Sequence, residues 1–128
     1  MQKFLIMAMF LLAILGFAGS AFSQCRTADK ELQKPIKITR GTTTAVRDTV
    51  RLCTSHTYRF RASRGERLAI KLTTGNKTSM TVLPPSGEAI VDGGLSFNGK
   101  LTETGEYEVQ IGTDATAAYT LRVLIVTR

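Results

Sequence analysis

The stretch HTYRFRASRGERLAIKL, residues 56–72, decides the fold class of this 128-residue chain. Apolar and polar side chains alternate from His56 to Ala62 and again from Leu68 to Leu72. A period of two is typical of β-strands that bury one face and expose the other. The intervening Ser63-Arg64-Gly65-Glu66 has the composition of a tight turn, in which Gly65 supplies a positive φ. We therefore expect two strands here, paired as a hairpin.

The same period of two recurs on both sides of this stretch. Beyond the N-terminal apolar segment, no part of the chain has a helical period. Short strands about 8–12 residues apart, roughly eight in number, imply a β-sandwich or barrel. We expect one all-β domain over residues 35–128, after a polar tail at residues 24–34. Its last strand has apolar residues on both faces near its end, which is typical of a strand that is central in a sheet or covered by another part of the structure. The other alternating runs are Ile36–Ile38, Val46–Val50, Met80–Val82, Ala89–Val91, Leu95–Phe97, Tyr107–Ile111 and Ala117–Thr127.

The first 23 residues have the three parts of a cleavable signal peptide. Lys3 gives a short positive start, Phe4–Leu15 is an unbroken apolar run, and Ala21-Phe22-Ser23 is a small-x-small cleavage site. We expect the cut between Ser23 and Gln24. The sequence therefore predicts export to the periplasm or the extracellular space.

Two other interpretations of this segment are less favourable. A transmembrane anchor needs about 20 apolar residues, and glycines at 16 and 19 interrupt the run, so we expect no membrane span. A lipid-anchored form would use Cys25, but the bacterial lipoprotein signal has a small residue directly before the cysteine. Gln24 stands there in this chain, which favours free release.

Cys25 and Cys53 are the only cysteines, an even number in a compartment that favours oxidation. We expect them to form a disulfide, whose contribution to stability is about 3–4 kcal/mol in the chain-entropy model. A zinc site would need more ligands, and His56 is the only histidine. The sequence therefore predicts no metal and no other cofactor.

The chain is basic. Its formal net charge of +7 falls to +6 when the segment that carries Lys3 is removed. An exported basic protein attracts anionic cell-envelope polymers, lipid head groups or acidic proteins, whereas nucleic acid is a poor candidate in that compartment. A local group of basic residues is most simply the solvated face of one hairpin. It consists of Arg59, Arg61, Arg64 and Arg67.

The order of strands and turns resembles the bacterial pre-peptidase C-terminal domain and the related sandwiches of periplasmic lysozyme inhibitors. The resemblance covers residues 36–126 and implies a jelly-roll-like antiparallel β-sandwich of about eight strands. Most of the matched positions are turn glycines and core residues, which report a fold. The motifs are Tyr58-Arg59-Phe60, Gly65, Leu68–Leu72, Val82–Gly87, Phe97–Leu101, Thr104–Val109 and Ala117–Leu121.

One motif could also carry function. Some periplasmic lysozyme inhibitors insert a Ser-Gly-x-Tyr-like loop into the lysozyme cleft, and Thr104-Gly105-Glu106-Tyr107 is similar. A hydroxyl and a phenol can both donate hydrogen bonds to catalytic carboxylates. Alternatively, Gly105 shapes a turn and Tyr107 is a core residue, because it shares the parity of Val109 and Ile111. The loop is locally acidic, with Glu103 and Glu108 beside Glu106.

The sequence argues against an enzyme. His56 has the parity of Tyr58 and Phe60, which favours a packing role, and there is no Gly-x-Ser-x-Gly nucleophile elbow. We expect a non-catalytic binding module whose ligand the sequence does not identify. The alternative is a lysozyme inhibitor that acts through Thr104 and Tyr107.

Overall fold

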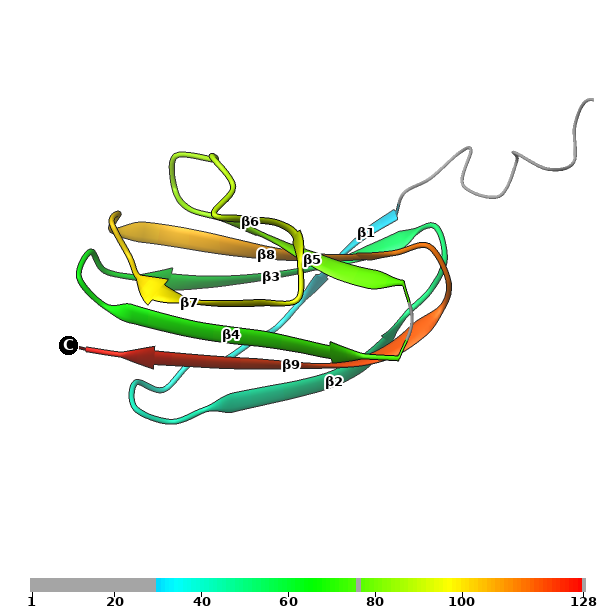
Figure 1. The fold of residues 1–128 in the computed structure, drawn as a ribbon, viewed down its shortest axis with the longest axis horizontal. Coiled ribbons are helices and arrows are strands. Elements are labelled where there is room, and N and C mark those ends of the chain that lie inside the picture. Colours follow the sequence, from blue (N-terminus) through cyan, green and yellow to red (C-terminus); the bar gives the residue numbers. More distant parts are fainter. Residues whose placement is uncertain (1–29, 76, 128) are drawn as a thin grey trace, which may run out of the picture.

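The computed structural model describes residues 30–75 and 77–127, which form two β-sheets packed face to face (Figure 1). Sheet A has the strand order β1-β3-β8-β5-β6, and sheet B has the order β2-β9-β4-β7. This part of the chain contains no helix of the length and hydrophobicity needed to span a bilayer. The strands are β1 (Lys30–Lys34), β2 (Thr44–Val50), β3 (Thr54–Ala62), β4 (Arg67–Thr74), β5 (Thr78–Leu83), β6 (Val91–Gly94), β7 (Ser96–Lys100), β8 (Gly105–Thr113) and β9 (Ala117–Val126).

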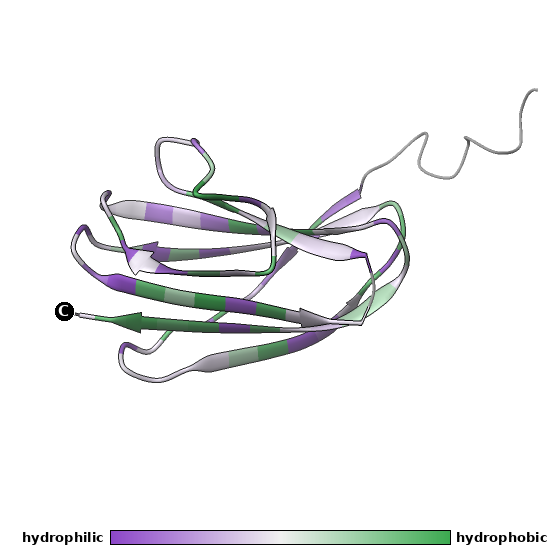
Figure 2. Cartoon of the chain, viewed as in Figure 1, coloured by the Kyte–Doolittle hydropathy of each residue, from purple (hydrophilic) through white to green (hydrophobic). Residues whose placement is uncertain are grey.

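The expected all-β sandwich is confirmed, and its alternation is visible strand by strand (Figure 2). Alternate residues of β3, β4, β8 and β9 are buried between the sheets, and full burial of each such apolar side chain contributes about 1.5–3 kcal/mol. β9 is flanked by β2 and β4, so the prediction of a central last strand is also confirmed. The fully buried core residues include Tyr58, Leu68, Val82, Val109, Leu121, Val123 and Ile125.

The expected hairpin between residues 56–62 and 68–72 is wrong. β3 pairs with β8, β4 pairs with β9 and β7, and the turn at residues 63–66 crosses from sheet A to sheet B. A hairpin and a crossover both bury every second residue, so the period of two could not distinguish them. The expectation for Gly65 holds, because its φ is 92°.

The N-terminal part of the domain also differs from expectation. Lys30–Lys34, assigned from its polar sequence to a tail, forms β1 and pairs with β3 in parallel at the edge of sheet A. Residues 35–39, where Ile36 and Ile38 predicted a strand, form none. Both isoleucines still pack against the core, which explains their alternation without strand pairing.

Candidate binding site at the loop end

Four connections meet at one end of the sandwich, on the left in Figure 1, and we call this region the loop end. It comprises residues 40–43, 63–66, 84–90 and 101–104. Backbone hydrogen bonds join two of these connections, from Gly65 N to Leu101 O and from Leu101 N to Glu66 O, each at 2.8 Å. The predicted motif Thr104–Tyr107 begins in this region and continues into β8.

Tyr107 lies in the core. Its side chain is 1% exposed and stacks on Phe60, with ring centroids 6.0 Å apart and an interplanar angle of 9°. The hydroxyl donates a hydrogen bond of 2.7 Å to the carbonyl of Glu103, and burial raises the pKa of the phenol. Of the two interpretations of this residue, the packing role is the one that its position supports, because a phenol buried in this way cannot enter a partner's cleft.

Gly105 has a structural reason to be glycine. Its φ of 148° is a conformation that other residues rarely adopt, and a Cβ there would lie 2.8 Å from Cγ of Pro85. The glycine therefore lets the start of β8 pass closely beneath the Pro84-Pro85 corner. The same two prolines follow the end of β5 at Leu83, because proline cannot donate a hydrogen bond to a strand ladder.

The other loop residues of the motif hold neighbouring turns in place. The Thr104 Oγ1 accepts a hydrogen bond of 2.9 Å from the backbone N–H of Arg64, in the turn that links the two sheets. The carboxylate of Glu103 accepts two hydrogen bonds from Ser86, at 3.0 Å from its backbone N–H and 2.9 Å from its hydroxyl. Residues 101–104 are thus bound to both adjacent connections.

An ion pair between the exposed Arg40 and the buried Glu66 completes the loop end. Arg40 Nε and Nη2 donate to the two carboxylate oxygens of Glu66 at 3.0 and 3.1 Å, and Nη2 also donates to the Arg61 carbonyl at 2.8 Å. Glu66 is 5% exposed, and it also accepts a hydrogen bond from the Ser63 N–H at 2.6 Å. The hydrogen bonds from Arg40 lower the pKa of the Glu66 carboxyl. No sequence signal marked this pair, because its members are 26 residues apart.

The exposed groups of the motif are Thr104 and Glu106. The acidity expected around Tyr107 is partly neutralised across the strand pair, since Arg59 lies 3.1 Å from the Glu108 carboxylate and 3.8 Å from that of Glu106. Glu106 is nevertheless 57% exposed. A shallow hollow of about 370 Å³ beside it is lined by Arg59, Leu83, Pro84, Pro85, Gly87, Glu106 and Glu108.

His56 lies far from the loop end along β3, in a buried polar chain. Its Nδ1 is 2.6 Å from the Tyr119 hydroxyl, which is 2.6 Å from the hydroxyl of Tyr58. Burial lowers the pKa of the imidazole, against the opposing effect of Asp48, so the ring is neutral at neutral pH. Nδ1 can then accept the Tyr119 proton while Tyr119 accepts that of Tyr58. The burial expected for His56 is confirmed, since the residue is 2% exposed.

Two further expectations concern ligating residues. The predicted disulfide joins Cys53 to Cys25, and Cys25 lies outside the described residues. Within residues 30–75 and 77–127, no group of three or more His, Cys, Asp or Glu side chains is placed to hold a metal ion.

Comparisons with known proteins agree with this architecture. No protein-family model matches the chain, and no curated protein matches it by sequence. Among solved structures, it is similar to Aeromonas hydrophila PliG, a periplasmic lysozyme inhibitor of g-type lysozyme, with 20% identity, a TM-score of 0.68 and coverage of 77% of this chain and 99% of that one. Salmonella Typhimurium PliG aligns at 14% identity and a TM-score of 0.58, over 73% and 96% of the two chains.

The pre-peptidase C-terminal domain of a Bacillus anthracis collagenase aligns at 13% identity and a TM-score of 0.60, also over 73% and 96% of the two chains. These likenesses confirm the fold that the resemblance implied, which is that of the pre-peptidase C-terminal domain and the periplasmic inhibitors.

Proposed function

We propose that this protein is an exported, non-catalytic module that binds a partner protein through its loop end, and that a g-type lysozyme is the partner. Residues 1–23 would direct it to the periplasm or the extracellular space, and Cys25–Cys53 would form its disulfide. The observation that carries the proposal is that hydrogen bonds join the connections of the loop end to one another. It holds Thr104 exposed on one connection and Glu106 exposed at the start of β8, beside connections fixed by Glu103–Ser86 and Arg40–Glu66.

A fixed loop end favours binding because little conformational entropy is lost when the partner docks. Thr104 still has its hydroxyl proton to donate, since its oxygen accepts the Arg64 N–H. Glu106 can accept from a basic group, which suits a cationic partner at contact distance despite the positive net charge of this chain. The PliG likeness, which spans 99% of the Aeromonas inhibitor, makes a g-type lysozyme the first candidate.

The test is a titration of purified protein against g-type, c-type and i-type lysozymes in a cell-lysis assay. We expect the g-type enzyme to be slowed in the micromolar range or below. If none of the three enzymes is slowed, the lysozyme proposal is wrong.

Variants then test the site. Thr104→Val and Glu106→Gln should each weaken inhibition, whereas Thr104→Ser retains the hydroxyl and should inhibit like the parent. Glu31→Gln is the matched control, because Glu31 is an exposed carboxylate of β1 near the other end of sheet A. Inhibition that survives both loop variants, with unfolding midpoints unchanged, would place the contact elsewhere on the molecule.

A further inference from the structure

The outer face of sheet B is uniformly basic, and we call it the basic face. Exposed cationic side chains project from each of its four strands, and in the described part of the chain none forms a salt bridge with a carboxylate. No Asp or Glu of the described residues shares this face. The cations are Arg47 on β2, Arg67 and Lys71 on β4, Lys100 on β7 and Arg122 on β9.

Four of these cations stand in like-charge pairs. Lys71 is directly opposite Arg122 in the β4–β9 register, and Arg67 is directly opposite Lys100 in the β4–β7 register. Like charges directly opposite each other destabilise a sheet. Where a sequence breaks a local rule of stability without compensation inside the fold, a functional site is the expected reason. An anion bound between the members of each pair would remove the repulsion.

The outer face of sheet A is built in the opposite way. There, Arg59 and Arg61 stand directly opposite Glu108 and Glu106, so the cross-strand pairs are complementary. Two further acids, Glu31 and Asp92, share that face. Positive charges are therefore paired with acids on the outer face of sheet A and are left unpaired on the outer face of sheet B. The positive net charge of the chain alone does not explain this difference between the two sheets.

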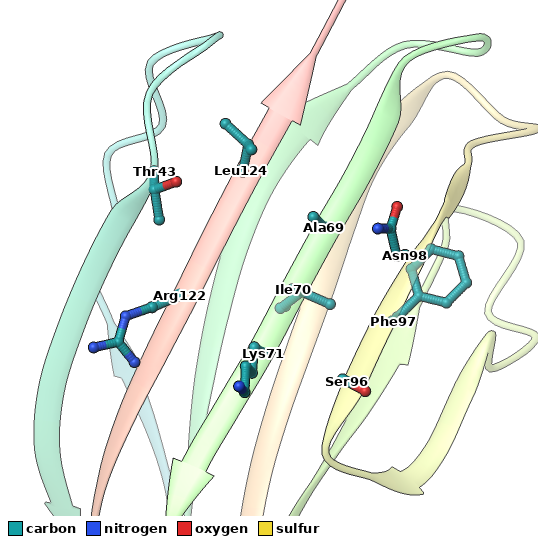
Figure 3. Close-up of a pocket in the computed structure, with 9 residues that line it drawn as sticks. All are labelled: Thr43, Ala69, Ile70, Lys71, Ser96, Phe97, Asn98, Arg122 and Leu124. Atoms are coloured by element: carbon teal, nitrogen blue, oxygen red, sulfur yellow. The ribbon is translucent and has the colours of Figure 1, made fainter.

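A hollow of about 310 Å³ lies on the basic face, and one of the two like-charge pairs, Lys71 and Arg122, is part of its lining (Figure 3). Ala69 and Leu124, directly opposite each other, provide apolar surface, and Thr43 and Asn98 provide polar groups. Arg67 and Lys71 are four residues apart on β4, so the two pairs are separated by about 13 Å at a rise of about 3.3 Å per residue. Along β4, the residue of this face between the two cation pairs is therefore Ala69, which lines the hollow.

We propose that the basic face binds an acidic polysaccharide, with carboxylate or phosphate groups at the two cation pairs and the intervening sugar rings over the hollow. The mixed lining suits a sugar, which presents both an apolar ring face and hydroxyls. A membrane surface fits less well, because it would favour large apolar side chains beside the cations. Of the large hydrophobic side chains exposed among the described residues, Ile90, Leu95 and Val126, only Val126 belongs to this face.

The experiment measures binding of the purified protein to an oligogalacturonate by titration calorimetry at low salt. Neutral malto-oligosaccharide and vesicles containing phosphatidylglycerol are separate arms. We expect the oligogalacturonate to bind, the neutral sugar not to bind, and the vesicles to bind more weakly. Binding should be lost in 1 M salt, where the Debye length is about 3 Å. Vesicle binding without oligogalacturonate binding would overturn the proposal.

Two double variants, Lys71→Gln/Arg122→Gln and Arg67→Gln/Lys100→Gln, should each lower the affinity about tenfold, because each removes two charge-assisted contacts. Each should also raise the unfolding midpoint of the free protein, since a repulsive pair is gone. Arg59→Gln/Arg61→Gln removes the same charge from sheet A and should change the affinity less than twofold. An equal loss in all three variants would mean that net charge alone drives binding, and the assignment to this face would be wrong.

Discussion

The hydroxyl of Tyr107 donates a hydrogen bond of 2.7 Å to the carbonyl oxygen of Glu103, four residues earlier in the chain. The bond joins a core side chain to the connection at residues 101–104, in which the Glu103 carboxylate accepts two hydrogen bonds from Ser86. Tyr107 therefore acts on the loop end from beneath. Its contribution to binding, if the loop end is the binding surface, is to hold that surface in place.

We expect Tyr107→Phe to lower the free energy of unfolding by about 1 kcal/mol, because it removes one hydrogen bond and keeps the ring. Tyr107→Ala should cost about 3–5 kcal/mol, because it also leaves a cavity beside Phe60. Urea denaturation measures both. A Tyr107→Phe variant that unfolds like the parent but no longer inhibits a lysozyme would contradict the buried role, since only direct contact of the phenol with the partner explains that pattern.

The Arg40–Glu66 pair predicts a pH dependence of stability. The folded state holds the pKa of Glu66 below its usual value, so the carboxylate stabilises the fold at neutral pH. This stabilisation is complete above about pH 4.3, the usual Glu pKa, and is lost as the pH falls through the lower folded-state value. Glu66→Gln should remove this dependence and cost about 1.5–3 kcal/mol at pH 7.

The measurement for Glu66 is a series of urea unfolding curves between pH 7 and the acid limit of the native protein. Glu88→Gln is the control, because Glu88 is an exposed acid of the same loop end. We expect its curves to follow those of the parent at every pH. A Glu66→Gln variant that loses stability with acid as the parent does would assign the effect to another group.

The buried chain Tyr58–Tyr119–His56 predicts unequal effects of two similar substitutions. Tyr119→Phe removes the central hydroxyl and leaves both Tyr58 and His56 without this partner, at a cost of about 1–3 kcal/mol. Tyr58→Phe removes only an end of the chain and should cost about 0.5–1.5 kcal/mol. Thermal and urea unfolding of the two variants give the comparison. Equal costs would mean that Tyr119 is not the link between the other two side chains.

Mass spectrometry of the exported protein tests the expected processing. We predict a mass that corresponds to residues 24–128 less two hydrogens, for cleavage after Ser23 and a Cys25–Cys53 disulfide. Cys53→Ser should lower the free energy of unfolding by about 3 kcal/mol, and reduction of the parent should have a similar effect. A retained N-terminal segment or a lipid adduct on Cys25 would show anchoring in place of release.

The strands that sequence predicts best are those whose alternation is long, such as 56–62, 107–111 and 117–127. Alternation arises because one face of a strand is buried. It shows which side chains point into the core, but it does not show which strand is the neighbour. Pairing depends on contacts between distant parts of the chain, so alternation alone could not predict the β3–β8 ladder. β1 could not be predicted from alternation either, because an edge strand can be polar when backbone hydrogen bonds to β3 hold it.

The candidate site shows the same division. The parity of Tyr107 with Val109 and Ile111 predicted its burial, and the turn role of Gly105 followed from its residue type. The Arg40–Glu66 pair and the cation pairs of the basic face could not be predicted in this way. Arg67 and Lys71 are visible on one strand, but Lys100 and Arg122 become their neighbours only through the strand order of sheet B.

The strand order also has a consequence for the time at which the chain can fold. β8 and β9, the last two strands, are central in sheets A and B. Until Gly105 and the residues after it are present, β3 has only β1 beside it, and β2 has no partner until β9 arrives. Isolated strand pairs are marginal in water, and pairings between distant segments form late. Stable structure is therefore delayed until β8 and β9 have been synthesised, which would suit the export proposed above, because an exported chain crosses the membrane before it folds.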